Sequence, residues 1–266
     1  MGNKYYKPEE TIFHDDGREE GLLAFIQSHP EYNQMRGNPK LILAAIDEYG
    51  QTRDFLMNVG HEKGKIVAED LIPSLEPDLM VELGGYVGYS ALLFGNAVKR
   101  SGGRKYLSLE RSPKFAGIAR VLIELAELDD VVEIVVGPCR DSLRKLRENH
   151  STGHVDVFFI DHAKLHYVND VKLCEELKLI GPGTTIIADN VISPGVPDYR
   201  DYVQISVAQK IEAMREEQQR LLGEVGPDKS LGNPQLVYET RLIDSFEPTG
   251  EPDSLEVTRC VKVEGN

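Results

Sequence analysis

Polar side chains follow two apolar segments of the chain, at the points where each segment ends. Asp161 closes the segment FFID, and Asp189 and Asn190 close the segment IIADN. Carboxylate and amide oxygens are hard donors of the kind that Mg²⁺ prefers, and three protein ligands leave about three octahedral positions open. We therefore expect these three side chains to hold Mg²⁺.

Lys164 lies three residues beyond Asp161 and would point to the same place. A nearby divalent cation disfavours the charged form of an amine, so Lys164 is a candidate general base. A structural explanation stays open for each position, with Asp189 and Asn190 in a turn or helix cap and Lys164 as a solvated lysine. His162 is also adjacent, but a single His at a strand end is more often a hydrogen-bonded structural residue, and we do not assign it to the metal.

A glycine-rich turn, VELGGYVGYS, contains Gly84, Gly85 and Gly88. Glycines there let the backbone adopt positive φ and approach a ligand closely. Tyr86 stands where a dinucleotide fingerprint needs its second glycine, which disfavours a pyrophosphate and hence a nicotinamide cofactor. Glu110, about one βαβ unit further on, can accept hydrogen bonds from both hydroxyls of a ribose. Together they favour a nucleoside without a diphosphate, most commonly S-adenosylmethionine, over the structural alternative of a tight turn and a surface Glu.

Short β-branched apolar runs alternate with amphipathic stretches between residues 79 and 190, the pattern of a parallel sheet with helices on both faces. The predicted strands are 79–83, 105–110, 131–137, 155–161 and 184–189. The carboxyl ends of such strands meet at one edge of the sheet, where open α/β sheets bind ligands. That edge would bring the candidate residues together.

The flanking segments complete a single predicted domain over residues 1–266. Helices are predicted at 18–28, 39–50 and 63–75, so that 18–75 forms a helical N-terminal part before a core at 79–200. A polar helix over 203–222 and a loop rich in Gly, Pro, Asp and Asn form an insertion at 203–234. Strands at 236–243 and 255–264 predict a C-terminal antiparallel hairpin within 236–264.

Composition excludes several classes of partner and location. The 266 residues contain 30 Lys and Arg against 44 Asp and Glu, a formal charge of −14 that disfavours nucleic acid and anionic membranes as partners. The three cysteines are far apart, which favours reduced thiols. No run approaches 18 apolar residues and no segment is of the signal-peptide type, so we expect a cytoplasmic protein without a membrane segment.

Five segments resemble, in order and spacing, the catechol O-methyltransferases: MNVGHEKG from Met57, VELGGYVGYS, LSLERSP with Glu110, FIDHAK, and ADNVISPGVPD. The resemblance extends from the helix at Arg18 to the last strand. It implies an α/β fold with a Rossmann-like, seven-stranded class I methyltransferase sheet, mostly parallel with one antiparallel strand. It also implies an enzyme that transfers a methyl group from S-adenosylmethionine to one hydroxyl of a Mg²⁺-chelated catechol, which we expect to act as a monomer.

The resemblance also assigns roles to individual residues. Asp161, Asp189 and Asn190 would hold the metal, Lys164 would be the base, and Glu256 in SLEV would contact the second catechol hydroxyl. The predicted cofactor-binding residues are Met57, Asn58, Val59, Glu82, Gly84, Tyr86, Tyr89, Ser90, Glu110, Cys139, Arg140 and Asp161.

Several positions depart from the family. Ala163 and Phe55 stand where the family has tryptophans, the chain contains no Trp, and Cys139 and Arg140 replace a Ser-Gln pair beside the adenine. The aromatic walls that hold a small catechol are thus altered, which leaves a second acceptor class open: a larger vicinal-diol phenol of the caffeoyl or secondary-metabolite type. A descendant that only binds the cofactor is disfavoured, because it would be expected to lose metal ligands and all three are present.

Overall fold

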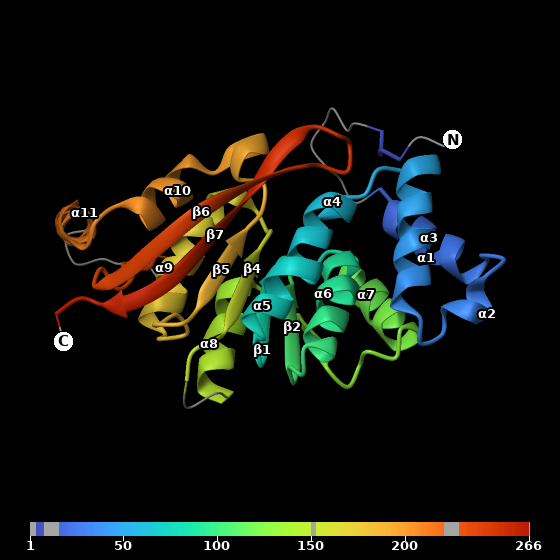
Figure 1. Ribbon diagram of the computed structural model, residues 1–266, viewed down its shortest axis with the longest axis horizontal. Helices are drawn as coiled ribbons and strands as arrows, with labels where there is room; N and C mark the ends of the chain where they lie inside the picture. Colours follow the sequence, from blue (N-terminus) through green and yellow to red (C-terminus); the bar gives the residue numbers. More distant parts are fainter. Residues whose placement is uncertain (1–3, 8–15, 150–152, 221–228, 266) are drawn as a thin grey trace.

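A mixed β-sheet forms the centre of the computed structural model, which describes residues 4–7, 16–149, 153–220 and 229–265 (Figure 1). Its strands lie in the order β3-β2-β1-β4-β5-β7-β6. Among the described strands only β7 runs opposite to the others, because it pairs antiparallel with both β5 and β6. This confirms the predicted seven-stranded, mostly parallel sheet. The strands are β1 (Leu79–Leu83), β2 (Lys105–Glu110), β3 (Val132–Val136), β4 (Val157–Ile160), β5 (Thr185–Ala188), β6 (Leu236–Phe246) and β7 (Pro252–Val263).

Helices cover both faces of the sheet, as predicted, and divide its core in two. In β1, Met80 packs into one core, with α3, α6 and α7, and its neighbour Val81 packs into the other, with α8, α9 and α10. In β4, Phe159 packs into the first of these cores and its neighbour Phe158 packs into the second. The helices are α1 (Arg18–Gln27), α2 (Tyr32–Met35), α3 (Pro39–Thr52), α4 (Gly60–Lys65), the π-helical turn η1 (Ile66–Leu71), α5 (Ile72–Leu75), α6 (Tyr89–Arg100), α7 (Pro113–Leu125), α8 (Cys139–Asn149), the 3₁₀ turn η2 (Lys164–His166), α9 (Tyr167–Glu176), the turn η3 (Val191–Gly195), α10 (Pro197–Gln204) and α11 (Val207–Arg220).

The helix predicted over 203–222 is wrong at its start. Residue 203 lies inside α10, and the chain becomes extended at Ile205, with φ −73° and ψ 152°, before α11 begins. Ser206 starts α11 with a capping box, since its hydroxyl accepts from the backbone N–H of Gln209 while the Gln209 amide oxygen accepts from the backbone N–H of Ser206. Residues 221–228, which include the end of that predicted helix and the first part of the loop predicted over 223–234, lie outside the described residues.

The β6–β7 hairpin is longer than predicted. Its strands extend to Phe246 and from Pro252, so that a turn of residues 247–251 lies at the far end of the ribbon, close to α4 and to the N-terminal residues (Figure 1). This turn is therefore brought next to the edge of the sheet where the candidate residues lie.

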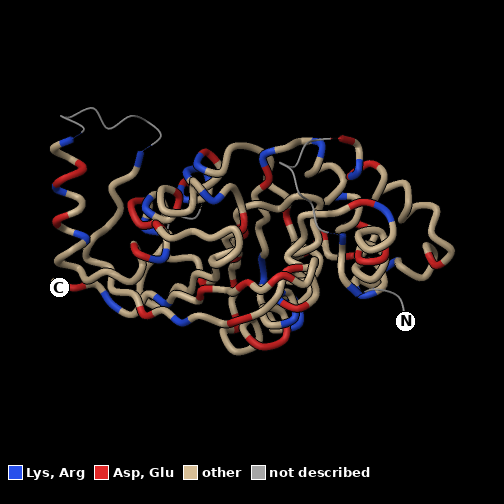
Figure 2. The backbone as a smooth tube through the Cα atoms, turned by 90° about the horizontal axis from the view of Figure 1, so that it is seen from above, with Lys and Arg blue, Asp and Glu red and all other residues tan. Residues whose placement is uncertain are grey.

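The structure also bears on the cysteines, on membrane-spanning helices and on the distribution of charge. The three cysteines are free, as predicted. Within the described ranges no helix combines the length and the apolar character needed to cross a bilayer. Acidic and basic residues are interspersed over the molecule (Figure 2).

Candidate active site

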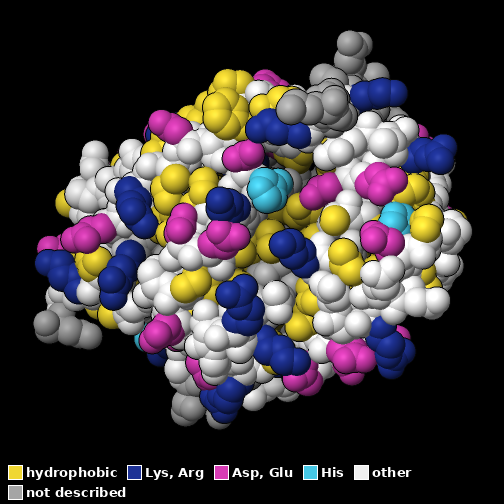
Figure 3. Space-filling view, turned by 45° about the vertical axis from the view of Figure 1, so that its right-hand side comes forward, with side chains coloured by type: hydrophobic (Ala, Val, Ile, Leu, Met, Phe, Trp, Pro, Cys, Tyr) yellow, Lys and Arg dark blue, Asp and Glu magenta, His cyan; other side chains and the backbone are white. Residues whose placement is uncertain are grey.

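A pocket of about 950 Å³ opens at the carboxyl ends of the parallel strands. Strand β1 lies between β2 and β4, so the crossovers of the sheet leave it in opposite directions and form the crevice in which open α/β sheets bind ligands. Hydrophobic side chains line a hollow near the centre of one face, with charged side chains around it (Figure 3). The pocket is at the upper end of the size range of small-molecule sites.

The glycine turn after β1 forms the floor of this pocket. Gly84 has a φ of 100°, and a Cβ at this position would lie 2.5 Å from the carbonyl oxygen of Asp161. Glycine is therefore needed for the turns after β1 and β4 to approach each other. Gly88, with a φ of 92°, precedes the first turn of α6, and a Cβ there would lie 2.9 Å from Ala119.

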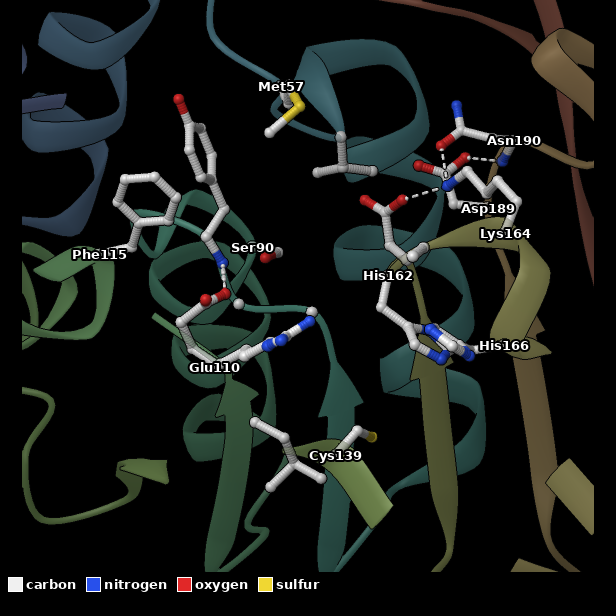
Figure 4. Close-up of a pocket in the computed structure, with 18 of the residues that line it drawn as sticks. Met57, Ser90, Glu110, Phe115, Cys139, His162, Lys164, His166, Asp189 and Asn190 are labelled. Atoms are coloured by element: carbon white, nitrogen blue, oxygen red, sulfur yellow. Dashed lines mark hydrogen bonds and ion pairs between the residues drawn. The ribbon is translucent and has the colours of Figure 1, made fainter. Parts of the chain in front are cut away.

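Glu110 is held at one end of the pocket by backbone N–H groups. Tyr86 donates to one carboxylate oxygen at 2.7 Å and Ser112 donates to the other at 2.6 Å. Burial raises the pKa of Glu110, and these backbone donors oppose that effect. Figure 4 places Glu110 on the opposite side of the pocket from Lys164, Asp189 and Asn190. This arrangement suits a carboxylate that accepts hydrogen bonds from a ribose.

Most predicted cofactor-binding residues line the pocket. They are Met57, Asn58, Val59, Gly84, Tyr86, Tyr89, Ser90, Glu110, Cys139, Arg140 and Asp161. Glu82 is the exception: it is absent from the described lining and fully buried behind it. It lies in β1 directly opposite Ser108 of β2, and its carboxylate accepts a hydrogen bond from the Ser108 hydroxyl. The structure thus places the Glu82 carboxylate behind the lining, next to Ser90, and its contact with a cofactor stays a prediction.

The burial of Glu82 predicts a pH-dependent stability. Burial raises the pKa of Glu82 to about 7, from an ordinary value of 4.5. A raised pKa in the folded state stabilises the fold fully below pH 4.5, and this contribution is lost as the pH rises through 7. Relative to Glu82→Gln, the unfolding free energy of the unmodified protein should therefore fall by up to about 3 kcal/mol between pH 4.5 and 8. Urea denaturation across this range, in EDTA, measures it; parallel curves for the two proteins would contradict the assignment.

Asp170 orders the side chains at the Cys139 end of the pocket. One of its oxygens accepts from Arg140 Nη1 at 3.2 Å, and the other lies 3.0 Å from His162 Nε2. The His162 ring also stacks on Tyr167, with ring centroids 5.1 Å apart. His162 is thus a hydrogen-bonded structural residue, the alternative favoured above. Burial, with the nearby Asp170 carboxylate, raises the pKa of Cys139 well above its ordinary value and keeps it a thiol.

The predicted metal ligands surround a positive charge. Lys164 Nζ donates to Asp161 Oδ1 at 2.9 Å and to Asn190 Oδ1 at 2.5 Å (Figure 4). The adjacent Asp189 is buried, and its Oδ1 accepts from the backbone N–H of Asn190 at 2.7 Å. The donors are all hard oxygens, and two of them already share a cationic group. The set therefore fits Mg²⁺ by its chemistry.

A buried lysine that sequence reasoning missed lies behind these ligands. Lys63, in α4, is fully buried and donates to Asp189 Oδ1 at 2.5 Å, Glu247 Oε1 at 2.6 Å and Asp253 Oδ2 at 3.0 Å. Burial disfavours its charge, but the three carboxylates outweigh burial and raise the pKa of Lys63 above its ordinary value. Despite Lys63, burial raises the pKa of Asp189 to about 6 and that of Glu247 to about 8. Where all three carboxyl groups are ionised, their charge exceeds that of the one ammonium, and a divalent cation would balance the excess.

A profile of the O-methyltransferase family matches residues 42–221. The chain belongs to the O-methyltransferase family. It is 36% identical over 214 residues to catechol O-methyltransferase B of Danio rerio, covering 80% of this chain and 78% of that protein. It is 34% identical over 198 residues to catechol O-methyltransferase of Bos taurus, covering 74% of this chain and 70% of that protein. The O-methyltransferase from Bacillus cereus, solved in complex with SAH, has the same fold, with a TM-score of 0.56, 24% identity and 94% of each chain covered.

The C-terminal hairpin of this O-methyltransferase lies beyond the matched residues, and here the predicted role of Glu256 is wrong. Glu256 is paired with Ala188 in the sheet and is only 1% exposed. Its two oxygens accept from Arg200 Nε and Gln204 Nε2, each at 2.8 Å, and it is absent from the described lining of the pocket. The tip of the hairpin reaches the pocket and the middle of β7 does not.

Glu247, at that tip, is the glutamate of the hairpin that reaches the pocket next to Asn190. It lines the pocket, and the amide of Asn190 donates to its Oε1. Glu247 precedes a turn rich in Gly and Pro, in the only stretch between the two C-terminal strands. This position at the start of the turn is the sequence signal that could have identified Glu247 as a pocket residue.

The lining of the pocket in this O-methyltransferase includes no tryptophan. Phe55, Met57, Ala163 and Pro194 line the pocket, and Leu165, two residues beyond Ala163, is 79% exposed outside the described lining.

Proposed function

We propose that this chain transfers the methyl group of S-adenosylmethionine to one hydroxyl of a catechol and that it requires Mg²⁺. The observation that carries the proposal is the arrangement of one pocket, with Glu110 at one end and the oxygens of Asp161, Asp189 and Asn190 at the other. The sequence identity of 34–36% between this chain and catechol O-methyltransferases supports a catechol as the acceptor. We also propose a monomeric, cytoplasmic enzyme, and the formal charge of −14 supports the absence of nucleic-acid and anionic-membrane partners.

The cofactor would lie along the glycine turn, with its ribose on Glu110 and its adenine toward Cys139 and Arg140. Gly84 lets the backbone approach the ligand closely. Tyr89 and Asn58 would contact the methionine part, since both line the pocket on the side of α6 and α4. The bound cofactor supplies an electrophilic methyl group.

The acceptor would lie against the oxygen donors and the hairpin turn. Asp161, Asp189 and Asn190 would hold Mg²⁺, which when bound supplies a Lewis acid that makes a phenolic hydroxyl more acidic. Lys164 Nζ would take the proton from that hydroxyl. Glu247 would accept a hydrogen bond from the second hydroxyl of the diol. The deprotonated oxygen would then attack the methyl group in line as the bond from sulfur to methyl breaks and S-adenosylhomocysteine leaves, so no covalent intermediate with the protein is needed.

The sizes of these effects indicate which residues matter most. Placing two reactants in the right geometry contributes about 7–11 kcal/mol to catalysis. A general base contributes a factor of about 10²–10⁴, or roughly 3–5 kcal/mol. Residues that orient the acceptor should therefore contribute more than Lys164.

Metal removal tests the proposed function directly. We expect methyl transfer from labelled S-adenosylmethionine to 3,4-dihydroxybenzoate with Mg²⁺, and its loss in excess EDTA. Transfer that continues in EDTA would contradict the assignment of the three metal ligands. If there is no transfer in either condition, calorimetric titration with S-adenosylmethionine decides between another acceptor and a protein that only binds the cofactor.

Two glutamates of the same hairpin provide a matched test of the acceptor side. Assayed above pH 8, where the Glu247 carboxyl is ionised, Glu247→Gln should raise the KM for the catechol about tenfold or more, because a hydrogen bond to a charged group contributes about 1.5–3 kcal/mol. The KM for S-adenosylmethionine should stay within about twofold, since Glu247 lies away from Glu110. Glu256→Gln should leave both constants unchanged, because its carboxylate faces Arg200 and Gln204. Equal effects of the two substitutions would place the acceptor elsewhere.

A larger vicinal-diol phenol is the second candidate acceptor, favoured by Ala163 and by the exposed Leu165. The small side chain of Ala163 in the lining leaves room beside Asp161 and Lys164 for an acceptor with an extension, and Leu165 is an exposed apolar residue near it in the sequence. Comparison of kcat/KM for 3,4-dihydroxybenzoate and for an extended caffeoyl ester separates the two. Ala163→Trp should lower the rate with the extended acceptor only.

A further inference from the structure

Residues 4–6, which we call the N-terminal strap, lie across the tip of the β6–β7 hairpin (Figure 1). The backbone N–H of Tyr6 donates to the carbonyl of Pro248 at 2.9 Å. The strap is also fixed to the helices, because the Lys4 carbonyl accepts from the Gln51 amide at 3.2 Å. Lys4 Nζ lies 3.4 Å from Glu62. The strap therefore connects the hairpin tip with α3 and α4.

The Tyr6 side chain is buried and reaches the wall of the pocket. Its hydroxyl donates to Asp47 Oδ1 at 2.7 Å, and the other oxygen of Asp47 accepts from the hydroxyl of Tyr89 at 3.1 Å. Asn58 Nδ2 donates to the Tyr6 oxygen at 3.4 Å. Asn58 and Tyr89 both line the pocket, so one phenol connects two of its wall residues.

Small residues make room for the strap and for the turn beneath it. A Cβ at Gly50 would lie 2.4 Å from the Tyr6 ring, and a Cβ at Gly250 would lie 3.1 Å from the ring of Tyr5. A Cβ at Gly60, in α4, would lie 2.6 Å from Pro248. The hairpin turn is thus packed closely between the strap and the start of α4, the helix that carries Lys63.

The turn held in this way carries the acceptor side of the pocket. Glu247, Thr249 and Glu251 all line the pocket. Within the turn, the backbone N–H of Glu247 donates to the Glu251 carbonyl and that of Gly250 donates to the Glu247 carbonyl, each at 2.8 Å. A shift of the turn would move Glu247 relative to Asn190 and Lys63.

We propose that Tyr6 is a positioning residue that fixes the hairpin turn, and with it Glu247, over the acceptor end of the pocket. It acts through the ring, which packs on Gly50 and so fixes the backbone whose N–H donates to Pro248. Its hydroxyl supports the wall at Asn58 directly and at Tyr89 through Asp47. This inference rests on the proposed function, since it concerns how an acceptor is placed. It assigns a role in methyl transfer to a residue that lies 3% exposed outside the pocket lining.

The test compares removal of the ring with removal of the hydroxyl. Tyr6→Ala should raise the KM for the catechol at least about fivefold, because misplacement of a reactant by about 1 Å has large effects on rate. Tyr6→Phe keeps the ring and should restore the catechol KM to within about twofold of the unmodified protein. In Tyr6→Phe the affinity for S-adenosylmethionine should fall instead, since Asn58 loses its acceptor and Asp47, which accepts from Tyr89, loses the Tyr6 donor.

Tyr238 provides the matched control. Its hydroxyl donates to the buried Glu175 at 2.6 Å, and neither residue is in the described lining of the pocket. Tyr238→Ala and Tyr238→Phe should therefore lower the thermal stability as the Tyr6 variants do, without changing either KM. A Tyr6→Ala protein whose catechol KM matches that of Tyr238→Ala would overturn the proposal.

Hydrogen–deuterium exchange tests the role of Tyr6 independently of whether a catechol is the acceptor. Amides of residues 247–251 should exchange faster in Tyr6→Ala than in the unmodified protein and in Tyr238→Ala. Unchanged exchange in the turn would overturn the proposal even if the protein methylates catechols. If the protein methylates no catechol, the proposed function fails, and the exchange rates still decide whether the strap holds the turn.

Discussion

Asp161→Ala is expected to lower kcat/KM for a catechol by about 10⁴-fold or more, a greater loss than that of Lys164→Ala. The substitution removes an oxygen donor from the proposed Mg²⁺ set and also the partner of the Lys164 amine at 2.9 Å. It therefore affects both the orientation of the acceptor, to which about 7–11 kcal/mol is attributed, and the base. Lys164→Ala removes the base alone, which predicts a loss of about 10²–10⁴-fold.

Asp156, in the loop before β4, provides the control for Asp161, which follows the other end of that strand. Its carboxylate accepts from the backbone N–H groups of Asp78 and Leu79, at the end of the sheet away from the pocket. Asp156→Ala should lower stability without changing the Mg²⁺ affinity. Steady-state kinetics at saturating Mg²⁺, with calorimetric titration of the ion, measure all three variants. Comparable losses in Asp161→Ala and Lys164→Ala with unchanged Mg²⁺ affinity would contradict Asp161 as a ligand.

The residues that could be predicted from sequence are those whose position follows from local pattern. The parallel strands are continuous apolar runs, because they are buried on both faces, and their carboxyl ends must share one edge. Asp161, Asp189 and Asn190 come directly after two such runs. Their meeting therefore follows from the topology. The capping box at Ser206 and Gln209 was also readable, and it marks the helix start that the amphipathic pattern missed.

The residues that could not be predicted are joined by contacts between distant parts of the chain. Lys63 is separated by 126 residues from Asp189, by 184 from Glu247 and by 190 from Asp253. A single lysine in a polar segment resembles a solvated surface residue until the fold buries it. The choice between Glu256 and Glu247 could not be predicted either. The length of the hairpin decides which of the two carboxylates reaches the pocket, and the local sequence pattern does not determine that length.

Lys63→Met is expected to lower the unfolding free energy by about 3–5 kcal/mol at neutral pH without added metal, because it leaves buried carboxylates without their cation. The lysine is fully buried and is the common partner of Asp189, Glu247 and Asp253. Since Asp189 belongs to the proposed metal set and the other two carboxylates lie beside it, Mg²⁺ should restore part of the lost stability by supplying positive charge in place of the lysine. Urea denaturation with Mg²⁺ and with EDTA measures both effects.

Lys210→Met is the matched control for a buried lysine. Lys210 is 3% exposed, donates to the Leu236 carbonyl at 3.1 Å and lies over the Tyr238 ring, and it is absent from the described lining of the pocket. Its loss should also destabilise the fold, but Mg²⁺ should not restore that stability, because the carboxylate near it, Glu175, is already bound by Tyr202 and Tyr238. If Mg²⁺ stabilises the two variants equally, or stabilises neither, the carboxylates around Lys63 do not form part of a cation site. A selective gain in Lys63→Met would show that the buried lysine and the metal compensate the same negative charge.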